Sequence, residues 1–326
     1  MFKIAEIVRK YLALWVAIIV CLALLIGYYF PVVAALKRIV PFILFLMLLP
    51  MMITIRIEDI TKVLKDPKLT VISILVNFLI VPLFGALWAH VLFRNADPFL
   101  ATGFILKVVV PCSGMVAAWT GYAKGRVESA LLIVALSLIL AIIFVPFWMW
   151  VLAGIYVKIE AVAMFRSILL IVILPLVAGL ATREVLVKRF GKQAFVKMSP
   201  IFPFISTCGM FLMQFTIIAP QARLIMSNFS WVILIFLGIA TLYPFIFVLT
   251  IFLAKWTRTG YVDGIALGYS VTARAHAITL GIATTTFGGT LAVLPAAVAP
   301  IIQVNIMALI LMFSKQIQNF FEDKPH

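Results

Sequence analysis

The sequence predicts an all-helical polytopic membrane protein, with ten transmembrane helices arranged as two inverted five-helix repeats. Its composition, its run of apolar stretches and the positions of its charges lead to this prediction. Of 326 residues, 65% are hydrophobic and 11% are charged, whereas a soluble domain has roughly 45–50% apolar and about 25% charged residues. The composition therefore excludes a soluble enzyme, a disordered chain and a nucleic-acid-binding module.

Ten apolar stretches follow one another along the chain, each long enough to cross about 30 Å of hydrocarbon. The alternating ten-residue pattern of a membrane barrel is missing, so we expect helices, which satisfy their own backbone hydrogen bonds in lipid. The first stretch follows basic residues as a signal peptide does, but it is too long and too apolar for one. The stretches are 12–30, 36–55, 69–93, 99–123, 127–154, 161–182, 198–220, 229–254, 261–287 and 290–314.

The net charge of +15 is distributed unevenly between the two ends of the predicted helices. Cytoplasmic loops of membrane proteins carry an excess of lysine and arginine. We therefore expect a multi-pass protein of the plasma or inner cell membrane, with both termini in the cytoplasm and a cytoplasmic face that attracts anionic lipid headgroups. That face holds Lys3, Arg9, Lys10, Arg56, Lys62, Lys65, Lys68, Lys124, Arg126, Arg183, Lys188, Arg189, Lys192, Lys197, Lys255, Arg258, Lys315 and Lys324, and the other holds Lys37, Arg38, Arg94, Lys158 and Arg223.

The longest polar stretch divides the chain into two halves. Five helices in each half would make the halves enter the membrane in opposite directions, as in the inverted repeats of many secondary transporters. We assign 1–182 to the first five-helix repeat, 183–197 to a cytoplasmic linker and 198–326 to the remainder of the second repeat. The second repeat begins at about residue 161, with the sixth stretch.

The fourth and ninth stretches contain features that interrupt helices, at corresponding places in the two halves. In the fourth, Pro111 removes a backbone donor, Ser113 and Gly114 follow it, and Lys107 lies one turn earlier. In the ninth, polar and ionisable residues fill the centre: Ser270, Thr272, Arg274 and His276. Inverted-repeat transporters bind their solute where such broken helices meet near the midplane.

Ionisable residues near the middle of a membrane cost roughly 3 kcal/mol each on insertion scales, and they usually serve a function. We predict that substrate is bound by Lys107 and Arg274 with the neighbouring polar residues Ser113, Ser270, Thr272 and Asn77. His276 is the residue expected to carry protons, because its unperturbed pKa is near 6.5. The structural alternative is that Lys107 snorkels to a boundary, Arg274 caps backbone carbonyls and His276 is a packing residue.

Carboxylates are missing from the predicted helix centres. A sodium site usually includes one, so we predict a sodium-independent mechanism and a preference for anions at the fixed positive charges. Backbone carbonyls with Ser270, Thr272 and Asn77 form the alternative, a neutral cation site. The eleven acidic residues fall in loops or at helix ends: Glu6, Glu58, Asp59, Asp66, Asp97, Glu128, Glu160, Glu184, Asp263, Glu322 and Asp323.

Cys112 follows Pro111 directly, where we expect unwound backbone to expose its thiol. Three cysteines are too few and too scattered for a disulfide framework, and Cys21 and Cys208 are interpreted as packing residues. A thiolate is a soft ligand, suited to a thiophilic solute rather than to magnesium or calcium. One thiol binds such a solute loosely enough to release it.

The fourth-stretch segment PCSGMVAAWTGYAKG resembles the signature of the arsenical-resistance (arsenite) permeases, in the bile acid/arsenite/riboflavin transporter superfamily. VNFLIVPL around Asn77 and APIIQVNIMAL in the tenth stretch also resemble that superfamily. The resemblance implies a core and a panel domain, with discontinuous helices four and nine crossing in the core. It also implies export of arsenite or antimonite in exchange for protons, with Cys112 as the metalloid ligand. The matching positions are Cys112, Met115, Val116, Trp119, Lys124 and Gly125.

Two positions differ from the arsenite permeases. Ala277 stands at or near the place of their ninth-helix glutamate, and Pro111 replaces the arginine that usually precedes the cysteine. We hypothesise that Lys107 and Arg274 supply the missing charge and that His276 carries the proton.

Two functions therefore remain open at this point: an arsenite or antimonite efflux permease working by alternating access, and a transporter of an organic anion such as a bile acid or carboxylate. An enzyme is not expected, because the few histidines have no acidic partner at midplane depth, and a channel does not need matched broken helices. We expect no cofactor. A homo-oligomer and a monomer are both compatible with the sequence.

Overall fold

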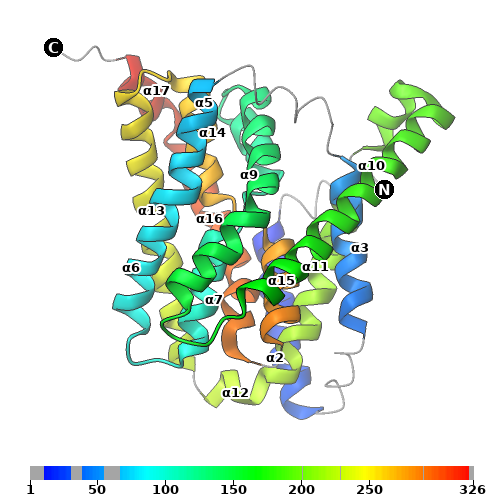
Figure 1. Cartoon of the computed structure of the whole chain (residues 1–326), viewed down its shortest axis with the longest axis vertical. Helices are drawn as coiled ribbons and strands as arrows, with labels where there is room; N and C mark the ends of the chain where they lie inside the picture. The colour runs from blue at the N-terminus through cyan, green and yellow to red at the C-terminus, as the bar shows by residue number, and fades with distance from the viewer. Residues whose placement is uncertain are drawn as a thin grey trace.

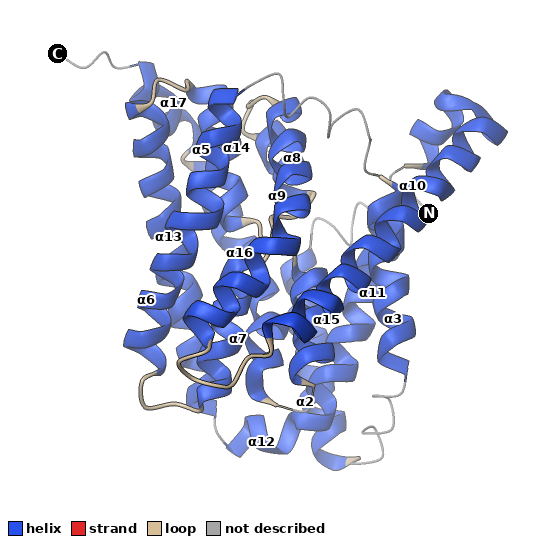
Figure 2. Ribbon diagram, viewed as in Figure 1, coloured by secondary structure: helices blue, strands red, loops and turns tan. Residues whose placement is uncertain are grey.

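A computed structural model describes residues 11–30, 39–54, 67–199, 201–227, 229–288 and 290–322. Helices joined by short loops make up this part of the chain (Figure 2). In chain order, the helices are α2 (Leu12–Tyr29), α3 (Val40–Ile53), α5 (Pro67–Leu75), η3 (Val76–Ile80), α6 (Val81–Phe93), α7 (Pro98–Val109), α8 (Met115–Tyr122), α9 (Val127–Trp148), η4 (Met149–Ala153), α10 (Ala161–Met198), α11 (Ile201–Ile218), η5 (Ala219–Gln221), α12 (Ala222–Ser227), α13 (Phe229–Trp256), α14 (Tyr261–Thr272), α15 (His276–Phe287), η6 (Leu291–Val293), α16 (Leu294–Met312) and α17 (Ser314–Glu322).

Each of the ten predicted apolar stretches coincides with helix in the described residues. Five helical segments are long and apolar enough to cross a membrane, and several shorter apolar helices accompany them. Large apolar side chains such as Phe42 and Val162 are 70% and 80% exposed. Such exposure is costly in water but normal against lipid. The prediction of a polytopic helical membrane protein is therefore confirmed, whereas the inverted relation between its halves stays a prediction.

The helices pack in two groups. α3 contacts α10 and α11, and α11 contacts α2; we call these four helices the flanking group. The second group, which we call the crossing group, consists of the helices from α5 to η4 and from α13 to α16. These helices correspond to the third, fourth, fifth, eighth, ninth and tenth predicted stretches. α15 and α16 contact helices of both groups (Figure 1). This division is the arrangement that the resemblance implies, with the discontinuous helices in the larger group.

Polar contacts tie the helix ends together at one end of the molecule. Arg126 and Asp263 form an ion pair of 3.0 Å, Ser129 donates a hydrogen bond to the same carboxylate, and Tyr261 donates one to the carbonyl of Ala123. α17 lies at this end, whereas α12 lies at the opposite end (Figure 1). The predicted cytoplasmic charges that the structure describes belong to helices and loops at the same end of the molecule as α17. Arg223, which was predicted on the other face, lies in α12 at the opposite end. Which end faces the cytoplasm stays a prediction, and the predicted charges within 1–10, 31–38, 55–66 and 323–326 lie outside the described residues.

The predicted linker 183–197 is helical. α10 continues through it to Met198 and changes direction at Gly191, whose φ of 82° and ψ of 158° interrupt the helical backbone. Figure 1 shows this end of α10 projecting from the bundle. Glycine adopts a positive φ without steric cost, so the chain turns here without a loop. The sequence prediction left the conformation of 183–197 open, and the structure shows that this polar segment extends the preceding membrane helix. The division of the chain into two repeats and a linker stays a prediction.

The two predicted discontinuities are present in the fold. α7 ends at Val109 and α8 begins at Met115, so residues 110–114 separate two half-helices. α14 ends at Thr272 and α15 begins at His276. Pro111 lacks an amide hydrogen, and its ring disfavours helical backbone in the preceding residue; Val110 accordingly is extended, with φ −62° and ψ 156°. The second interruption contains no proline; Ala273 is its first residue and Ala275 its last.

The close approach of α7 to η6 holds the first half-helix in place. A Cβ added at Gly103 would lie 2.1 Å from the backbone oxygen of Ala292, a separation that requires the backbone to shift. We expect Gly103→Ala to lower stability by about 1–3 kcal/mol through overpacking. In detergent, its apparent melting temperature should fall by about 3 °C or more.

Gly121→Ala is the matched control, because a Cβ at Gly121 makes an ordinary contact of 3.4 Å with Val127. Alanine also favours the helix at this position. Equal melting temperatures for the two variants would contradict the close packing of α7 on η6.

Candidate functional site

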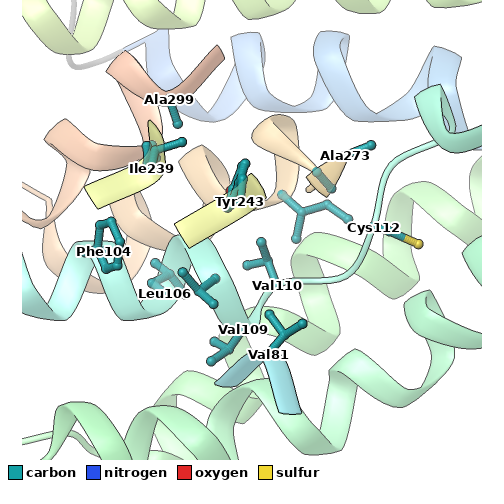
Figure 3. Packing of buried hydrophobic residues seen from close by; sticks show 14 of the residues in the cluster. Val81, Phe104, Leu106, Val109, Val110, Cys112, Ile239, Tyr243, Ala273 and Ala299 are labelled. Carbon is teal, nitrogen blue, oxygen red and sulfur yellow. The ribbon is translucent and has the colours of Figure 1, made fainter. Parts of the chain in front are cut away.

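The two helix breaks cross each other and exchange backbone hydrogen bonds. The amide of Ser113 donates to the carbonyl of Ala273 at 2.7 Å, and the amide of Ala275 donates to the carbonyl of Pro111 at 3.0 Å. Cys112 and Arg274 are thereby paired as in an antiparallel β-bridge. Figure 3 shows Val110, Cys112 and Ala273 around this crossing, with Tyr243 of α13 beside it. Backbone that leaves a helix inside a membrane must find other partners, and each break supplies them to the other.

Arg274 is fully buried at the crossing. Its Nη1 donates to the carbonyl of Val110 at 3.1 Å, which caps the backbone freed by the end of α7. Its Nε and Nη2 have no hydrogen-bond partner, and no ion pair to Arg274 occurs among the described residues. Nε and Nη2 form the side-on edge of the guanidinium, which matches two oxygens of a carboxylate. Arg274 therefore caps backbone, as the structural alternative expected, and also presents a free anion-binding edge.

Lys107 and His276 meet across the two breaks. Nζ of Lys107 lies 2.9 Å from Nδ1 of His276, and the two residues are 0% and 6% exposed. Lys107 occupies the last turn of α7, where a cation favours the negative end of the helix dipole. His276 begins α15, and its Nε2 is buried without a partner. Lys107 is buried between the helices rather than extended toward a boundary, which does not agree with the snorkelling alternative; Nζ lies at hydrogen-bonding distance from His276.

Cys112 is also fully buried, which corrects the expectation that unwound backbone exposes its thiol. α9 covers it: Sγ lies 3.1 Å from Oγ of Ser137. The hydroxyl of Ser137 donates to the carbonyl of Val134 at 2.9 Å, so the Cys112 thiol is the donor in the contact between them. Cys21 and Cys208 are exposed on the surface of the helices. In this conformation the sulfur is closed to solvent.

The other predicted site residues have different surroundings. Asn77 donates to Oγ of Ser270 at 3.0 Å, which joins η3 to α14. Ser113 is nearly buried, and its Oγ accepts a bond of 3.3 Å from the amide of Met115 at the start of α8. Thr272 is buried but bonds only to carbonyls of its own helix. Pro111 and Gly114 lie between α7 and α8, and nothing is described for the side chain of Ala277.

Three residues at the site were not assigned to it from the sequence. Ser137 contacts Cys112, Gln303 of α16 donates to the carbonyl of Arg274 at 3.3 Å, and Tyr243 is fully buried beside the crossing with a hydroxyl that has no partner. Each is a polar residue in an otherwise apolar membrane helix, and that isolation is a signal in the sequence. The contact partner of each residue could not be inferred from the sequence, because each contact joins segments that are distant along the chain.

The described part of the site combines fixed positive charge, a thiol and neutral hydrogen-bonding groups. No cluster of three His, Cys, Asp or Glu side chains that could hold a metal ion occurs among the described residues. Buried cations without carboxylates attract anions and repel cations. Lys107, Cys112 and Arg274 are all closed to solvent in this conformation.

Comparison with known proteins places this fold in a family. Residues 41–228, more than half of the chain, match the Sodium Bile acid symporter family. The chain belongs to this family. It is therefore a transporter of this family, and the apolar helices described above agree with a membrane-embedded protein.

Individual relatives are named for different solutes, or for none. The chain is 27% identical to the arsenical-resistance protein Acr3 of Alkaliphilus metalliredigens, over 97% of the chain and 94% of that protein. It is 26% identical to the uncharacterized transporter slr0944 of Synechocystis, over 97% of the chain and 91% of that protein. A third relative, BASS3 of Oryza sativa, is described as a probable chloroplastic sodium/metabolite cotransporter and is 26% identical over 77% of the chain and 57% of that protein.

The contact between Asn77 and Ser270 should contribute to holding α14 in place. Asn77→Ala removes both hydrogen bonds of the buried Nδ2, to Ser270 and to the carbonyl of Ser73. We expect a loss of about 1–2 kcal/mol, because a buried hydrogen bond contributes about 1 kcal/mol and its loss leaves an acceptor unpaired. Thermal unfolding in detergent measures this loss.

Asn305→Ala is the control, since Asn305 is exposed and bonds only to the carbonyl of Ile301 in its own helix. A melting temperature for Asn77→Ala no lower than that of Asn305→Ala would show that the contact contributes nothing.

Proposed function

We propose that this transporter exports trivalent arsenic or antimony, with Cys112 as the metalloid ligand. The observation that carries the proposal is the position of the Cys112 thiol at the crossing of the two broken helices, paired through its backbone with Arg274. The similarity to an arsenical-resistance protein over 97% of the chain supports the same substrate. Export fits a protein of the plasma or inner cell membrane with both termini in the cytoplasm.

The chemistry of the site suits a neutral thiophilic hydroxide. Arsenous acid exchanges one hydroxyl for sulfur, so that an As–S bond forms, an As–O bond breaks, and the thiol proton leaves with the hydroxyl as water. The Ser137 hydroxyl, 3.1 Å from the sulfur, is placed to hydrogen-bond a remaining hydroxyl of the solute. With one thiol in contact, the reaction reverses readily, and a transporter must release what it binds.

An organic anion is the second candidate, favoured by the unpartnered edge of Arg274. Nε and Nη2 of Arg274 are buried without acceptors, and Lys107 adds a second buried basic group. A bile acid or other carboxylate would supply the missing negative charge. Relatives described as probable sodium/metabolite cotransporters favour a solute of this kind.

Protons fit the site better than sodium as the coupling ion. The acceptors Asn77 Oδ1 and Gln303 Oε1 are buried and unpartnered, but they are neutral. Sodium bound there would lie near Arg274 without a carboxylate to balance either charge. His276 and Lys107 are basic groups that bind protons, so we propose proton coupling without sodium.

The first test replaces the thiol. Cys112→Ser keeps size and polarity but removes the soft ligand, so we expect arsenite and antimonite transport to fall at least about tenfold, which corresponds to about 1.4 kcal/mol. The measurement is arsenite efflux and growth of an arsenite-sensitive strain, with membrane insertion checked by immunoblot.

Cys21→Ser and Cys208→Ser are the matched controls, because both thiols lie on the exposed surface of the helices. Wild-type arsenite efflux by Cys112→Ser would exclude the sulfur as metalloid ligand.

The second test examines the anion edge. Arg274→Lys retains the charge but loses the planar two-donor edge. If a carboxylate binds there, its affinity should fall about tenfold, measured as a ligand-dependent shift of melting temperature with a bile acid and a short monocarboxylate. Arg223→Lys is the control, since Arg223 is exposed and also donates to a carbonyl, that of Tyr28.

A carboxylate that stabilises the wild type and Arg274→Lys equally would exclude the anion edge as its site. If neither carboxylate shifts the wild type, the organic-anion candidate fails.

A further inference from the structure

Lys107 and His276 form a close contact between two buried basic side chains. Nζ and Nδ1 are 2.9 Å apart across the crossing, and 169 positions separate the two residues in the chain. Both are buried, so water cannot screen one from the other. This contact was not anticipated from the sequence, which assigned Lys107 to substrate and His276 to the proton.

The chemistry of the two nitrogens allows one proton between them. A lysine ammonium is a donor with no acceptor, so Nδ1 must carry a lone pair to accept its hydrogen bond. His276 is then neutral, with its proton on Nε2. If Nδ1 were protonated as well, two cations would face each other at hydrogen-bonding distance, and Arg274 would add a third charge two residues away. The contact therefore excludes the doubly protonated pair, and at most one positive charge is shared by the two residues.

The surroundings contain no acid that would neutralise a second charge. α15 packs on α3, α7, α10, α11, η6 and α16, and α7 packs in addition on α6, α9 and η4. Within their bounds, α3, η4, η6 and α16 carry no titratable side chain. α11 contributes Cys208, α10 Arg166 and the charges of its projecting end, α6 His90 and α9 Glu128. Cys208, Arg166, His90 and Glu128 are all exposed. Arg274, Cys112 and Tyr243 are the remaining titratable groups at the crossing.

We propose that Lys107 and His276 act as one proton-binding site, in which the exchangeable proton resides on Nζ of Lys107 and Nδ1 of His276 retains it. This proposal rests on the proposed proton coupling and names the group that carries the proton. On release, the Nζ–H bond breaks, the proton leaves to water, and Lys107 remains as a neutral amine beside a neutral imidazole. Uptake from the opposite side restores the ammonium. His276 is a positioning residue for this proton rather than its sole carrier.

The pair also links the proton to an anion at Arg274. Charge on Lys107 favours an anion at the crossing, because both cations then share one counter-charge. When Lys107 loses that proton, Arg274 is the cation that remains to bind the anion. Proton binding and anion binding should therefore strengthen each other, as thermodynamic linkage requires of any two coupled sites.

The test measures proton binding by the purified full-length protein in detergent, without substrate. Wild type and Lys107→Arg are titrated between about pH 5 and pH 9, a range over which an exposed lysine and any arginine stay protonated. We expect the wild type to release about one proton per chain that Lys107→Arg does not release. Lys315→Arg, a change at an exposed lysine, should match the wild type.

His276→Gln separates the pair from a histidine acting alone. Glutamine offers an oxygen acceptor to Nζ but does not titrate, so the proton should remain and its midpoint should move. Superimposable titrations of Lys107→Arg and the wild type, or loss of the proton in His276→Gln only, would overturn the proposal. If Lys107→Arg does not fold, as judged by size-exclusion chromatography, Lys107→Gln provides the same comparison.

The outcome is independent of the transported solute. The titration contains no arsenite and no carboxylate, so failure of Cys112→Ser to affect efflux leaves the proton result unchanged. Conversely, if wild type and Lys107→Arg release the same number of protons, the pair is not the coupling site, and the proposal that Cys112 binds the metalloid is unaffected.

Discussion

The reciprocal backbone pairing of the two helix breaks is the constraint on which the rest of the site depends. Inside a membrane, an unpaired amide or carbonyl costs several kcal/mol, so neither break could exist without the other. Ser113 and Ala275 donate across the crossing, and Arg274 and Gln303 bond to the remaining carbonyls. This pairing brings Lys107, Cys112 and His276 close together, because all three lie in or within a few residues of the breaks.

Charge is distributed unusually at this crossing. Buried charges are normally paired, yet Arg274 leaves one edge of its guanidinium without a partner, and Lys107 bonds to another basic group. Related transporters described as sodium/metabolite cotransporters share the family, but a cation site here would have to form beside fixed positive charge. An anion would offset the charge of Arg274, whereas a neutral solute with hydroxyl groups would pair with the free donors of its guanidinium.

The buried state of Cys112, Lys107 and Arg274 also bears on movement. A closed site of this kind must open separately to each side for transport to occur. The polar contacts around Asp263, Arg126 and Tyr261 lie at one end of the crossing group and hold α9 and α14 together. Ser137, which covers the thiol, lies on the same α9. Contacts at the end of α9 and at its middle therefore join this helix both to α14 and to the first break.

Apolar length, proline chemistry and the PCSGMVAAWTGYAKG segment are local properties of the chain, so they were enough to predict a helical membrane protein, the two helix interruptions and the family. The sequence did not determine that 183–197 continues α10, because a polar stretch can be a helix or a loop until packing decides. The partners at the site were decided by tertiary structure alone: Lys107 with His276, Cys112 with Ser137 and Asn77 with Ser270. Each pair joins different helices, and only the packing of those helices specifies which buried polar groups satisfy one another.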